Sequence, residues 1–357
     1  MRHTRVRRRR STTTTARRQP VSQGFSQPLR VLVPFAQLDE HEQINPNIQA
    51  ANPVDRYFEC MKVAFASVKR VSPDAELVFI SNAPLPERHR TDFEALGVAS
   101  EVIPFLHKAP QGFLPSFQAS VFVLDVVAGL DERPCILLDP DVVVIRPLEE
   151  LVEELGGQCG AYALKMPARH MYNGVSRLTS AEAHARIDGD RTLPWYYGGE
   201  MYVFQGPSVR AIQARAERAW ETALAEFEAG RTDYLRTEEH IMNYALHRQD
   251  VASLDHRVRR IWTAHSMRGV RADDGDLTVW HLPAEKSGGF SRVAVAVGKR
   301  DSWFWTVSLP EWRSRLSEEF VLGRRTPLRL ALDLAGHGRR LWRQRRVPPF
   351  EQLHDHT

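Results

Sequence analysis

The stretch ILLDPDVVVIRPL (Ile136–Leu148) holds two apolar runs that are separated by two acids and a proline. The first run, with Cys135 before it, is typical of a buried strand. Asp139 and Asp141 follow the end of that strand, and residues two apart can project from the same side. Two carboxylates with no cation between them repel each other and are costly to bury. The stretch therefore predicts a pair of acids that requires a positive partner.

A hard divalent cation would supply that partner, because Mg²⁺ and Mn²⁺ prefer oxygen ligands and often bind one or two carboxylates together with substrate phosphates. Pro140 would stiffen the turn that presents the two acids. The same Asp-x-Asp pattern also occurs at 188–190 and 274–276, among turn residues, where we expect solvated loops. Only the copy at 139–141 follows a buried strand, and we predict a metal site there.

Elsewhere, strand-like and helix-like segments alternate, which predicts an α/β fold with a mixed, mostly parallel central sheet. We expect strands over 29–36, 76–82, 98–105, 135–138, 157–165, 198–206 and from 277, where a strand leads into a Gly-rich loop ending at 290. We expect helices over 54–71, 87–97, 116–130, 208–230 and 237–248, and a polar loop over 165–195. No linker interrupts the body, so we predict one domain over 29–320. In such sheets ligands bind at the carboxyl ends of the strands.

The charge is distributed unevenly along the 357 residues. The first twenty residues hold eight arginines and no acid, and a second basic block runs from 324 to 346, while residues 21–323 carry a net charge of about −9. We therefore expect basic tails at 1–28, disordered, and at 321–357, around a mildly acidic body. A nucleic-acid binder usually carries its basic surface on the folded domain, so we expect no nucleic-acid partner.

The start of the chain and its cysteines indicate the cellular compartment. No apolar leader follows the basic start, and Cys60, Cys135 and Cys159 have no CxxC spacing and an odd count. We interpret the cysteines as buried small residues in a reducing, cytoplasmic setting. An Arg-rich, acid-poor start also fits an organelle transit peptide, and the basic ends also fit peripheral contact with an anionic membrane, so both alternatives stay open.

With these residues in view, ILLDPDVVVIRPLEEL (136–151) resembles the DxD segment of GT-A nucleotide-sugar glycosyltransferases, especially family 8, which contains glycogenin and lipopolysaccharide galactosyltransferases. The resemblance covers about 29–290 in element order. DRYFECMKVAFASVKR is similar to the family's first helix and implies that Tyr57 lies against a nucleotide base. WHLPAEKSGGF resembles the family's His-x-x-Gly-x-x-Lys and implies that His281 joins the metal ligands and that Lys286, one residue early, binds the diphosphate.

Two further segments carry the resemblance. YYGGEMYVF is similar to the family's Asn-Ser-Gly strand, with Gly198 and Gly199 keeping the small residues near the sugar and a tyrosine in place of the asparagine. EEHIMNYAL resembles the Asp-Gln-Asp-x-x-Asn helix start, which aligns Glu238 with the first Asp and implies that Asn243 binds substrate. Glu239 and His240 depart from the family's pattern.

The resemblance implies a metal-dependent transfer of sugar from a nucleoside-diphosphate sugar, a UDP-sugar favoured, to an acceptor hydroxyl, with retention. Imidazole beside two carboxylates favours Mn²⁺ over Mg²⁺. Inversion would require a carboxylate base near the acceptor, and Glu200, Glu238 and Glu239 are the candidates for it. The acceptor is unknown, and a lipid-linked acceptor would fit a protein at a membrane surface.

Two other classes remain as alternatives. One is a non-catalytic protein that binds a membrane surface or a nucleotide sugar. The other is a nucleotidyltransferase, which would be expected to carry a Gly-rich basic phosphate loop after its first strand. PFAQLDEHEQ (34–43) is acidic there and has no glycine, which counts against this class.

Overall fold

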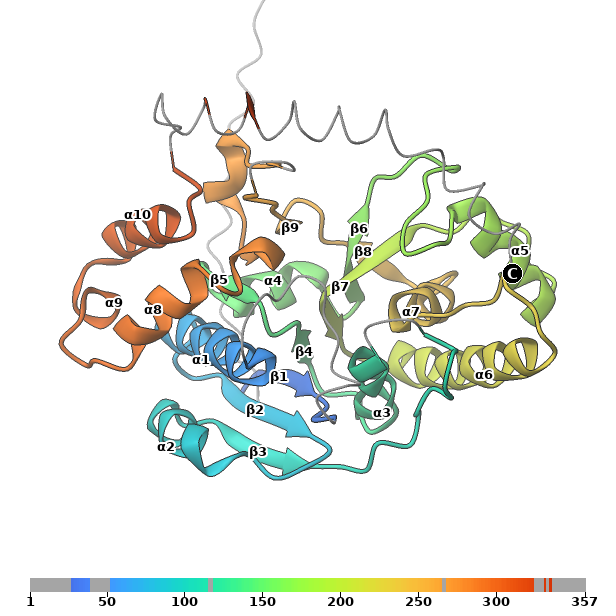
Figure 1. Ribbon diagram of the computed structural model, residues 1–357, viewed down its shortest axis with the longest axis horizontal. Coiled ribbons are helices and arrows are strands. Elements are labelled where there is room, and N and C mark those ends of the chain that lie inside the picture. Colours follow the sequence, from blue (N-terminus) through green and yellow to red (C-terminus); the bar gives the residue numbers. More distant parts are fainter. Residues whose placement is uncertain are drawn as a thin grey trace, which may run out of the picture.

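The computed structural model describes residues 27–38, 52–114, 118–264 and 268–323, together with 331, 334 and 335. Both basic ends lie almost wholly outside these residues, so their disorder and the boundaries of the domain at 29 and 320 stay predictions. The strands are β1 (Arg30–Phe35), β2 (Glu76–Ser81), β3 (Ala99–Val102), β4 (Cys135–Leu138), β5 (Val142–Val144), β6 (Cys159–Leu164), β7 (Tyr196–Phe204), β8 (Val251–Ser253), β9 (Val258–Arg260) and β10 (Val279–His281) (Figure 1).

The helices surround these strands. They are α1 (Pro53–Val71), α2 (Glu87–Leu96), α3 (Phe122–Ala128), α4 (Leu148–Leu155), α5 (Arg177–Asp188), α6 (Ser208–Glu228), α7 (Glu238–Leu246), α8 (Gly289–Val297), α9 (Trp303–Thr306) and α10 (Leu309–Glu319), with short 3₁₀ helices over Gln118–Val121, Ala272–Asp276 and Pro283–Glu285. Within the part of the chain that the structure describes, no helix has both the length and the apolarity needed to cross a membrane.

The central sheet has seven strands in the order β3-β2-β1-β4-β7-β6-β8. Strand β7 runs antiparallel to both of its neighbours, β4 and β6, while the other pairs in the sheet are parallel. The α/β class with a mixed, mostly parallel sheet is therefore confirmed. Because β1 and β4 are adjacent and parallel, their carboxyl ends meet at one edge of the sheet, which is where Asp139 follows β4.

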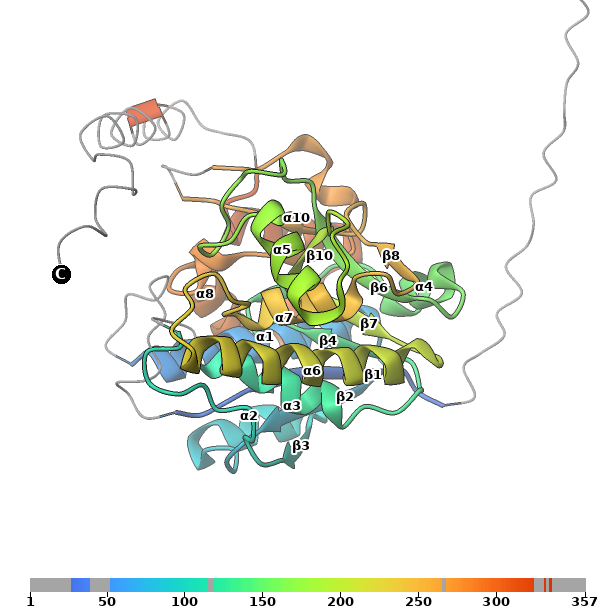
Figure 2. The ribbon, with the colours of Figure 1, turned by 90° about the vertical axis from the view of Figure 1, so that its right-hand side faces the viewer.

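Both faces of the sheet are covered, which explains why β4 is apolar throughout and β1 is apolar after Arg30. Val31 and Val33 of β1 pack into the cluster that contains α1 and α8, whereas Leu32 packs into the cluster on the other face with α3, α6 and α7. Helix α1 begins at Asn52, whose side chain accepts from the Asp55 N–H. The two helical layers lie on either side of the sheet in Figures 1 and 2.

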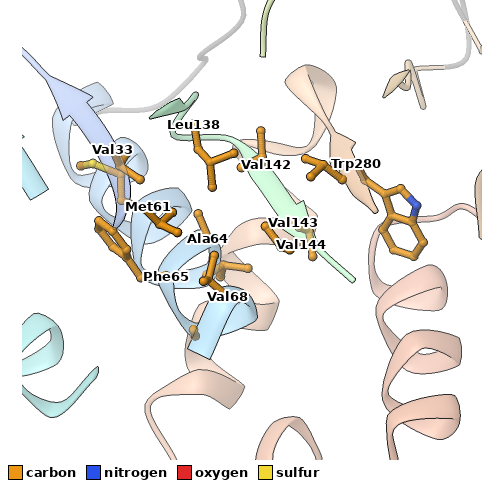
Figure 3. Packing of buried hydrophobic residues seen from close by; sticks show 14 of the residues in the cluster. Val33, Met61, Ala64, Phe65, Val68, Leu138, Val142, Val143, Val144 and Trp280 are labelled. Atoms are coloured by element: carbon orange, nitrogen blue, oxygen red, sulfur yellow. The ribbon is translucent and has the colours of Figure 1, made fainter. Parts of the chain in front are cut away.

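The second apolar run of the opening stretch belongs to another sheet. Strand β5 pairs with β10, antiparallel, and β10 pairs with β9, so that these three short strands form a separate sheet. Figure 3 shows Val143 and Val144 between the apolar face of α1 and Trp280 of β10. The Ser67 hydroxyl of α1 also accepts the Val144 N–H at 3.0 Å. The acids at 139–141 therefore lie where the chain passes from one sheet to the other.

Three expectations about elements need correction. The polar loop expected over 165–195 contains α5, which begins at Ser176, whose side chain accepts the Thr179 N–H, and ends before Gly189, whose φ is +81°. The strand expected over 98–105 ends at Val102, because Pro104 has no N–H to continue the ladder. The Gly-rich loop expected up to 290 ends earlier, since α8 begins at Gly289.

The remaining expected elements are present with small shifts at their ends. Helix α7 begins after Thr237, whose side chain accepts the His240 N–H, as its position before the helix predicts. The helix expected over 116–130 is a 3₁₀ turn followed by α3, with residues 115–117 outside the described range. All three cysteines are buried and unbonded to one another, as expected.

Candidate functional site

Asp139 and Asp141 are held by different sheets. The Asp139 N–H donates to the backbone oxygen of Glu200 at 3.0 Å and so extends the pairing of β4 with β7. The backbone oxygen of Asp141 accepts from the Leu282 N–H at 3.0 Å and so extends the pairing of β5 with β10. The separation and direction of the two carboxylates are therefore set by the junction of the sheets.

His281 is brought to the two acids by the register of β10. It lies opposite Val142, the residue after Asp141. Its Nε2 is 3.2 Å from Oδ2 of Asp141 and 3.3 Å from Oδ2 of Asp139. The three ligand atoms of Asp139, Asp141 and His281 lie within 4.8 Å of one another, and no other such group of three occurs among the described residues.

The cluster is buried and strongly charged. Asp141 is fully buried, and its Oδ2 contacts the ammonium of Lys286, which is also buried. Burial by itself would raise the pKa of Asp141, but the positive charges of Lys286 and His281 outweigh it and hold that pKa well below its usual range. Burial opposes protonation of His281, yet the carboxylate of Asp141 raises its pKa well above the ordinary value.

The donor set fits a divalent cation. Oδ1 of Asp141 is buried and has no hydrogen-bond partner, which is costly unless a cation or water binds it. Two carboxylates and one imidazole suit Mn²⁺ or a related metal. The other ring nitrogen of His281, Nδ1, lies 3.3 Å from Oε1 of Glu200, the kind of second contact that orients a ligating histidine.

A cavity of about 450 Å³ is lined on one side by Asp139, Asp141, His281 and Lys286. Tyr57 of α1, Tyr172 and Trp262 supply aromatic surface. The ring of Tyr57 packs against Phe35 at 5.1 Å between centroids and lies 5.9 Å from the Lys286 ammonium. The volume falls in the range of cavities that hold nucleotide-sized ligands.

The cavity contains most of the residues that the sequence predicts for the site. Its lining includes Tyr57, Asp139, Asp141, Gly199, Glu238, His281 and Lys286, whereas Gly198, Glu200 and Asn243 are not part of it. The roles of these residues in binding and catalysis stay predictions. What the structure shows is that residues from five distant segments of the chain surround one space.

The three predicted residues outside the cavity lining contact residues that surround the site. Glu200 is fully buried, and its Oε1 contacts Arg260 and His281, so it lies behind His281 as seen from the cavity lining. Gly198 leaves room for it, because a Cβ there would lie 1.9 Å from Oε2 of Glu200. Asn243 donates to the Tyr197 carbonyl at 2.9 Å and accepts the Tyr197 N–H, which fixes β7 to α7.

Arg260 had no predicted role, and Glu239 was predicted only as a possible base. The carboxylate of Glu239 accepts four hydrogen bonds. Its Oε1 accepts from the Gly199 N–H at 3.0 Å and from Arg260 at 2.8 Å, and its Oε2 accepts from the Tyr196 hydroxyl at 2.9 Å and from Asn173 at 3.1 Å. These donors fix the carboxylate, which is a poor arrangement for a mobile base.

Arg260 joins the two halves of the site. Its guanidinium contacts Glu200, which lies beside His281, and Glu239, and it lies 5.3 Å from the centroid of the Tyr172 ring. It is the last residue of the three-residue strand β9. A strand of three residues is too short to show an alternation of apolar and polar side chains. In the sequence, Arg260 is therefore simply the second of two consecutive arginines.

The other two Asp-x-Asp copies are only in part the solvated loops that we expected: Asp276 is 86% exposed, whereas Asp190 and Asp274 are held by ion pairs. Asp190 forms ion pairs with Arg248 and His247, and its side chain is 15% exposed. Asp274 is buried and pairs with Arg259 at 2.5 Å, while its Oδ2 accepts the Arg271 N–H at 2.7 Å. Neighbouring arginines compensate the charge of Asp190 and of the buried Asp274 individually.

No protein-family model and no curated protein matches the chain. Solved structures are similar to it. One is the galactosyltransferase LgtC in complex with donor and acceptor sugar analogues, at 15% identity and a TM-score of 0.46, covering 84% of this chain and 98% of LgtC. Another is mouse xyloside xylosyltransferase 1, at 16% identity and a TM-score of 0.43, covering 71% and 97%.

A third similar structure is the glycosyltransferase GlyE of Streptococcus pneumoniae TIGR4, at 14% identity and a TM-score of 0.43, covering 81% of this chain and 64% of GlyE. All three of these similar structures are glycosyltransferases. At these identities and scores the likeness does not establish a family, and the assignment of a function depends on the residues of the site.

Proposed function

We propose that the protein is a metal-dependent glycosyltransferase of the GT-A type, whose catalytic domain spans 29–320. It would transfer a sugar from a nucleoside-diphosphate sugar, a UDP-sugar favoured, to an acceptor hydroxyl. The observation that carries the proposal is the convergence of Asp139, Asp141 and His281 with the buried Lys286 at one cavity. Carboxylates, imidazole and a cation in one wall are the groups that a metal-bound diphosphate requires.

Asp139, Asp141 and His281 are the residues that would hold the metal, Mn²⁺ favoured because of the imidazole. When bound, the metal would act as a Lewis acid that neutralises charge developing on the departing diphosphate. Lys286 would contribute a second positive charge at the same place, and it is already fixed there by burial. Glu200 would keep the His281 ring in its orientation through Nδ1.

The remaining side chains of the cavity support the placement of the two substrates. Tyr57 offers an aromatic face for a nucleotide base beside the diphosphate-binding lysine. Gly199 has its N–H fixed by Glu239 and carries no side chain, so a sugar can approach the backbone there. Holding donor and acceptor side by side supplies much of the rate enhancement in such reactions.

Glu238 is the carboxylate that we assign to the reaction itself. It lines the cavity and accepts a hydrogen bond from the Ser120 hydroxyl, and burial raises its pKa. A carboxyl group of raised pKa is suited to exchange protons with an acceptor hydroxyl. We propose retention of the anomeric configuration, as the resemblance implies, with Glu238 close to the reacting sugar.

Thermal unfolding with UDP-, GDP- and dTDP-sugars, each with and without Mn²⁺, tests the proposal. One nucleotide class should raise the midpoint by several degrees only when Mn²⁺ is present, because a ligand that binds the folded state stabilises it. Slow hydrolysis of the same sugar donor should accompany the shift. Binding without any consumption of donor would favour a non-catalytic nucleotide-sugar-binding protein, and no shift with any of the nucleotides would contradict the proposal.

A further inference from the structure

Exposed apolar side chains are concentrated in one segment of the folded body. Nine large apolar residues are exposed among those that the structure describes, and four of them fall between 171 and 195. They are Met171, Leu178, Leu193 and Trp195, with exposed fractions of 57%, 43%, 38% and 54%. Single exposed apolar residues are ordinary, but a group of four suggests a surface that is covered by something else.

Contacts within the segment bring the loop before α5, the first turn of α5 and Trp195 close together. Arg177 lies 5.0 Å from the centroid of the Trp195 ring and donates to the Pro194 carbonyl at 2.7 Å. The Leu178 N–H donates to the Ala168 carbonyl at 3.2 Å, so the first turn of α5 lies against the loop before it. We call the surface formed by Met171, Leu178, Leu193 and Trp195 the α5 surface, and α5 lies on the side of the molecule that Figure 2 turns toward the viewer.

Basic residues outnumber acids around the α5 surface. Residues 165–195 contain five basic residues and three acids, of which Asp188 pairs with Arg215, Asp190 pairs with Arg248 and Glu182 is exposed. Residues 165–178 contain Lys165, Arg169 and Arg177 and no acid, and Arg191 follows α5. Arg169 and Arg191 are exposed, and neither forms an ion pair with any residue that the structure describes. Arginine beside exposed Trp and Leu is the combination that binds an anionic lipid interface, because the apolar groups enter the boundary while the guanidinium groups meet the headgroups.

The α5 surface adjoins the substrate cavity. Tyr172, next to Met171, lines the cavity, and Tyr196, next to Trp195, donates to Glu239 within it. The rings of Tyr172 and Tyr196 are in contact, with centroids 4.8 Å apart. Tyr172 thus lines the cavity and Tyr196 contacts a residue of its lining, while Met171 and Trp195, which precede them in the chain, are exposed.

We propose that the α5 surface docks the protein on an anionic lipid membrane and so presents the cavity to an acceptor carried by lipid. The acceptor part rests on the proposed function, while the docking does not. The contact differs from one made by the basic ends, because it is formed by the folded body and depends on apolar side chains as well as charge.

Sedimentation of the full chain with vesicles tests the docking. The chain should bind vesicles of equal parts phosphatidylglycerol and phosphatidylcholine, and the double variant Leu178→Ser/Trp195→Ser should bind them about tenfold more weakly, since it loses apolar burial at the interface. Leu106→Ser is the matched control, because Leu106 is 75% exposed elsewhere on the molecule. Arg169→Glu/Arg191→Glu should also weaken binding, and Arg300→Glu, at another exposed arginine, should not.

Two outcomes would overturn the inference: no binding of the unsubstituted chain to the anionic vesicles, or binding of the α5-surface variants as tight as that of the controls, which would assign the contact to the basic ends. Mn²⁺-dependent binding of the nucleotide sugar, measured without vesicles, should be unchanged in every variant. That measurement shows that the variants are folded, and its failure in the unsubstituted chain would count against the proposed function and not against the docking.

Discussion

Asp141→Asn is expected to lower the rate of sugar transfer by about 10³-fold, because it removes both a metal ligand and the anion that faces Lys286. Asparagine keeps the size of the side chain, so the cavity should keep its shape. Transfer of radiolabelled sugar, or release of the nucleoside diphosphate, measures the effect. Binding of the nucleotide should also lose its dependence on Mn²⁺.

Two further variants distinguish an effect on metal binding from an effect on folding. Asp139→Asn changes the other carboxylate of the cluster, which is 35% exposed, and it should lower transfer with a smaller effect on stability. Asp276→Asn changes an acid of another Asp-x-Asp copy, 86% exposed, and should leave transfer unchanged. Transfer by Asp141→Asn within a few fold of the unsubstituted rate would rule out the role given to this carboxylate.

Lys286→Met is expected to destabilise the metal-free protein by about 3 kcal/mol, because it leaves the fully buried Asp141 without the ammonium that neutralises it. Mn²⁺ should recover more stability in this variant than in the unsubstituted chain, since the ion replaces the missing charge. Denaturant unfolding with and without Mn²⁺ measures both quantities. The variant should also bind the diphosphate more weakly.

Lys62→Met is the matched control for this experiment. Its ammonium forms an ion pair with Asp92 at 2.8 Å, but that carboxylate is 41% exposed and keeps water as an alternative partner. We expect Lys62→Met to lower the free energy of unfolding by less than about 1 kcal/mol, and Mn²⁺ should not recover this loss. If Lys286→Met and Lys62→Met lost the same free energy of unfolding, the buried carboxylate of Asp141 would not need a neighbouring cation.

The position of the acids could be predicted from the sequence because it depends on local pattern. A buried apolar run followed by Asp139, Pro140 and Asp141 implies a strand that ends at polar residues, and β4 ends at Leu138. The alternation of strands with helices likewise predicted the parallel half of the sheet. Each of these features is encoded within a few residues.

The partners of the acids depend on pairings that no local pattern encodes. His281 meets Asp141 because β5 and β10 pair in a register that sets Val142 opposite His281, and both strands have three residues. The resemblance suggested this meeting, whereas the periodicity of the sequence did not. The position of Arg260 could not be predicted for the same reason, because it depends on the pairing of β9 with β10 over only three residues.

Helix α5 shows a different reason for a missed element. Its signals were present in Ser176 before it and Gly189 after it, which are typical of a helix start and a helix end. Between them only Ile187 of the five buried positions is a large apolar residue, and the others, such as Ser180 and His184, are small or polar, so no apolar stripe marks the helix. The α5 surface, with its exposed Leu178, could not be recognised without the helix.

The central claim is that Asp139, Asp141 and His281 bind one divalent ion that receives the diphosphate of the donor. Anomalous scattering from crystals grown with Mn²⁺ and UDP measures this most directly. The account predicts a single manganese peak bonded to Oδ atoms of both aspartates and to Nε2 of His281, with a diphosphate oxygen as a further ligand. A cluster without manganese beside bound UDP, or a manganese ion held elsewhere, would contradict it.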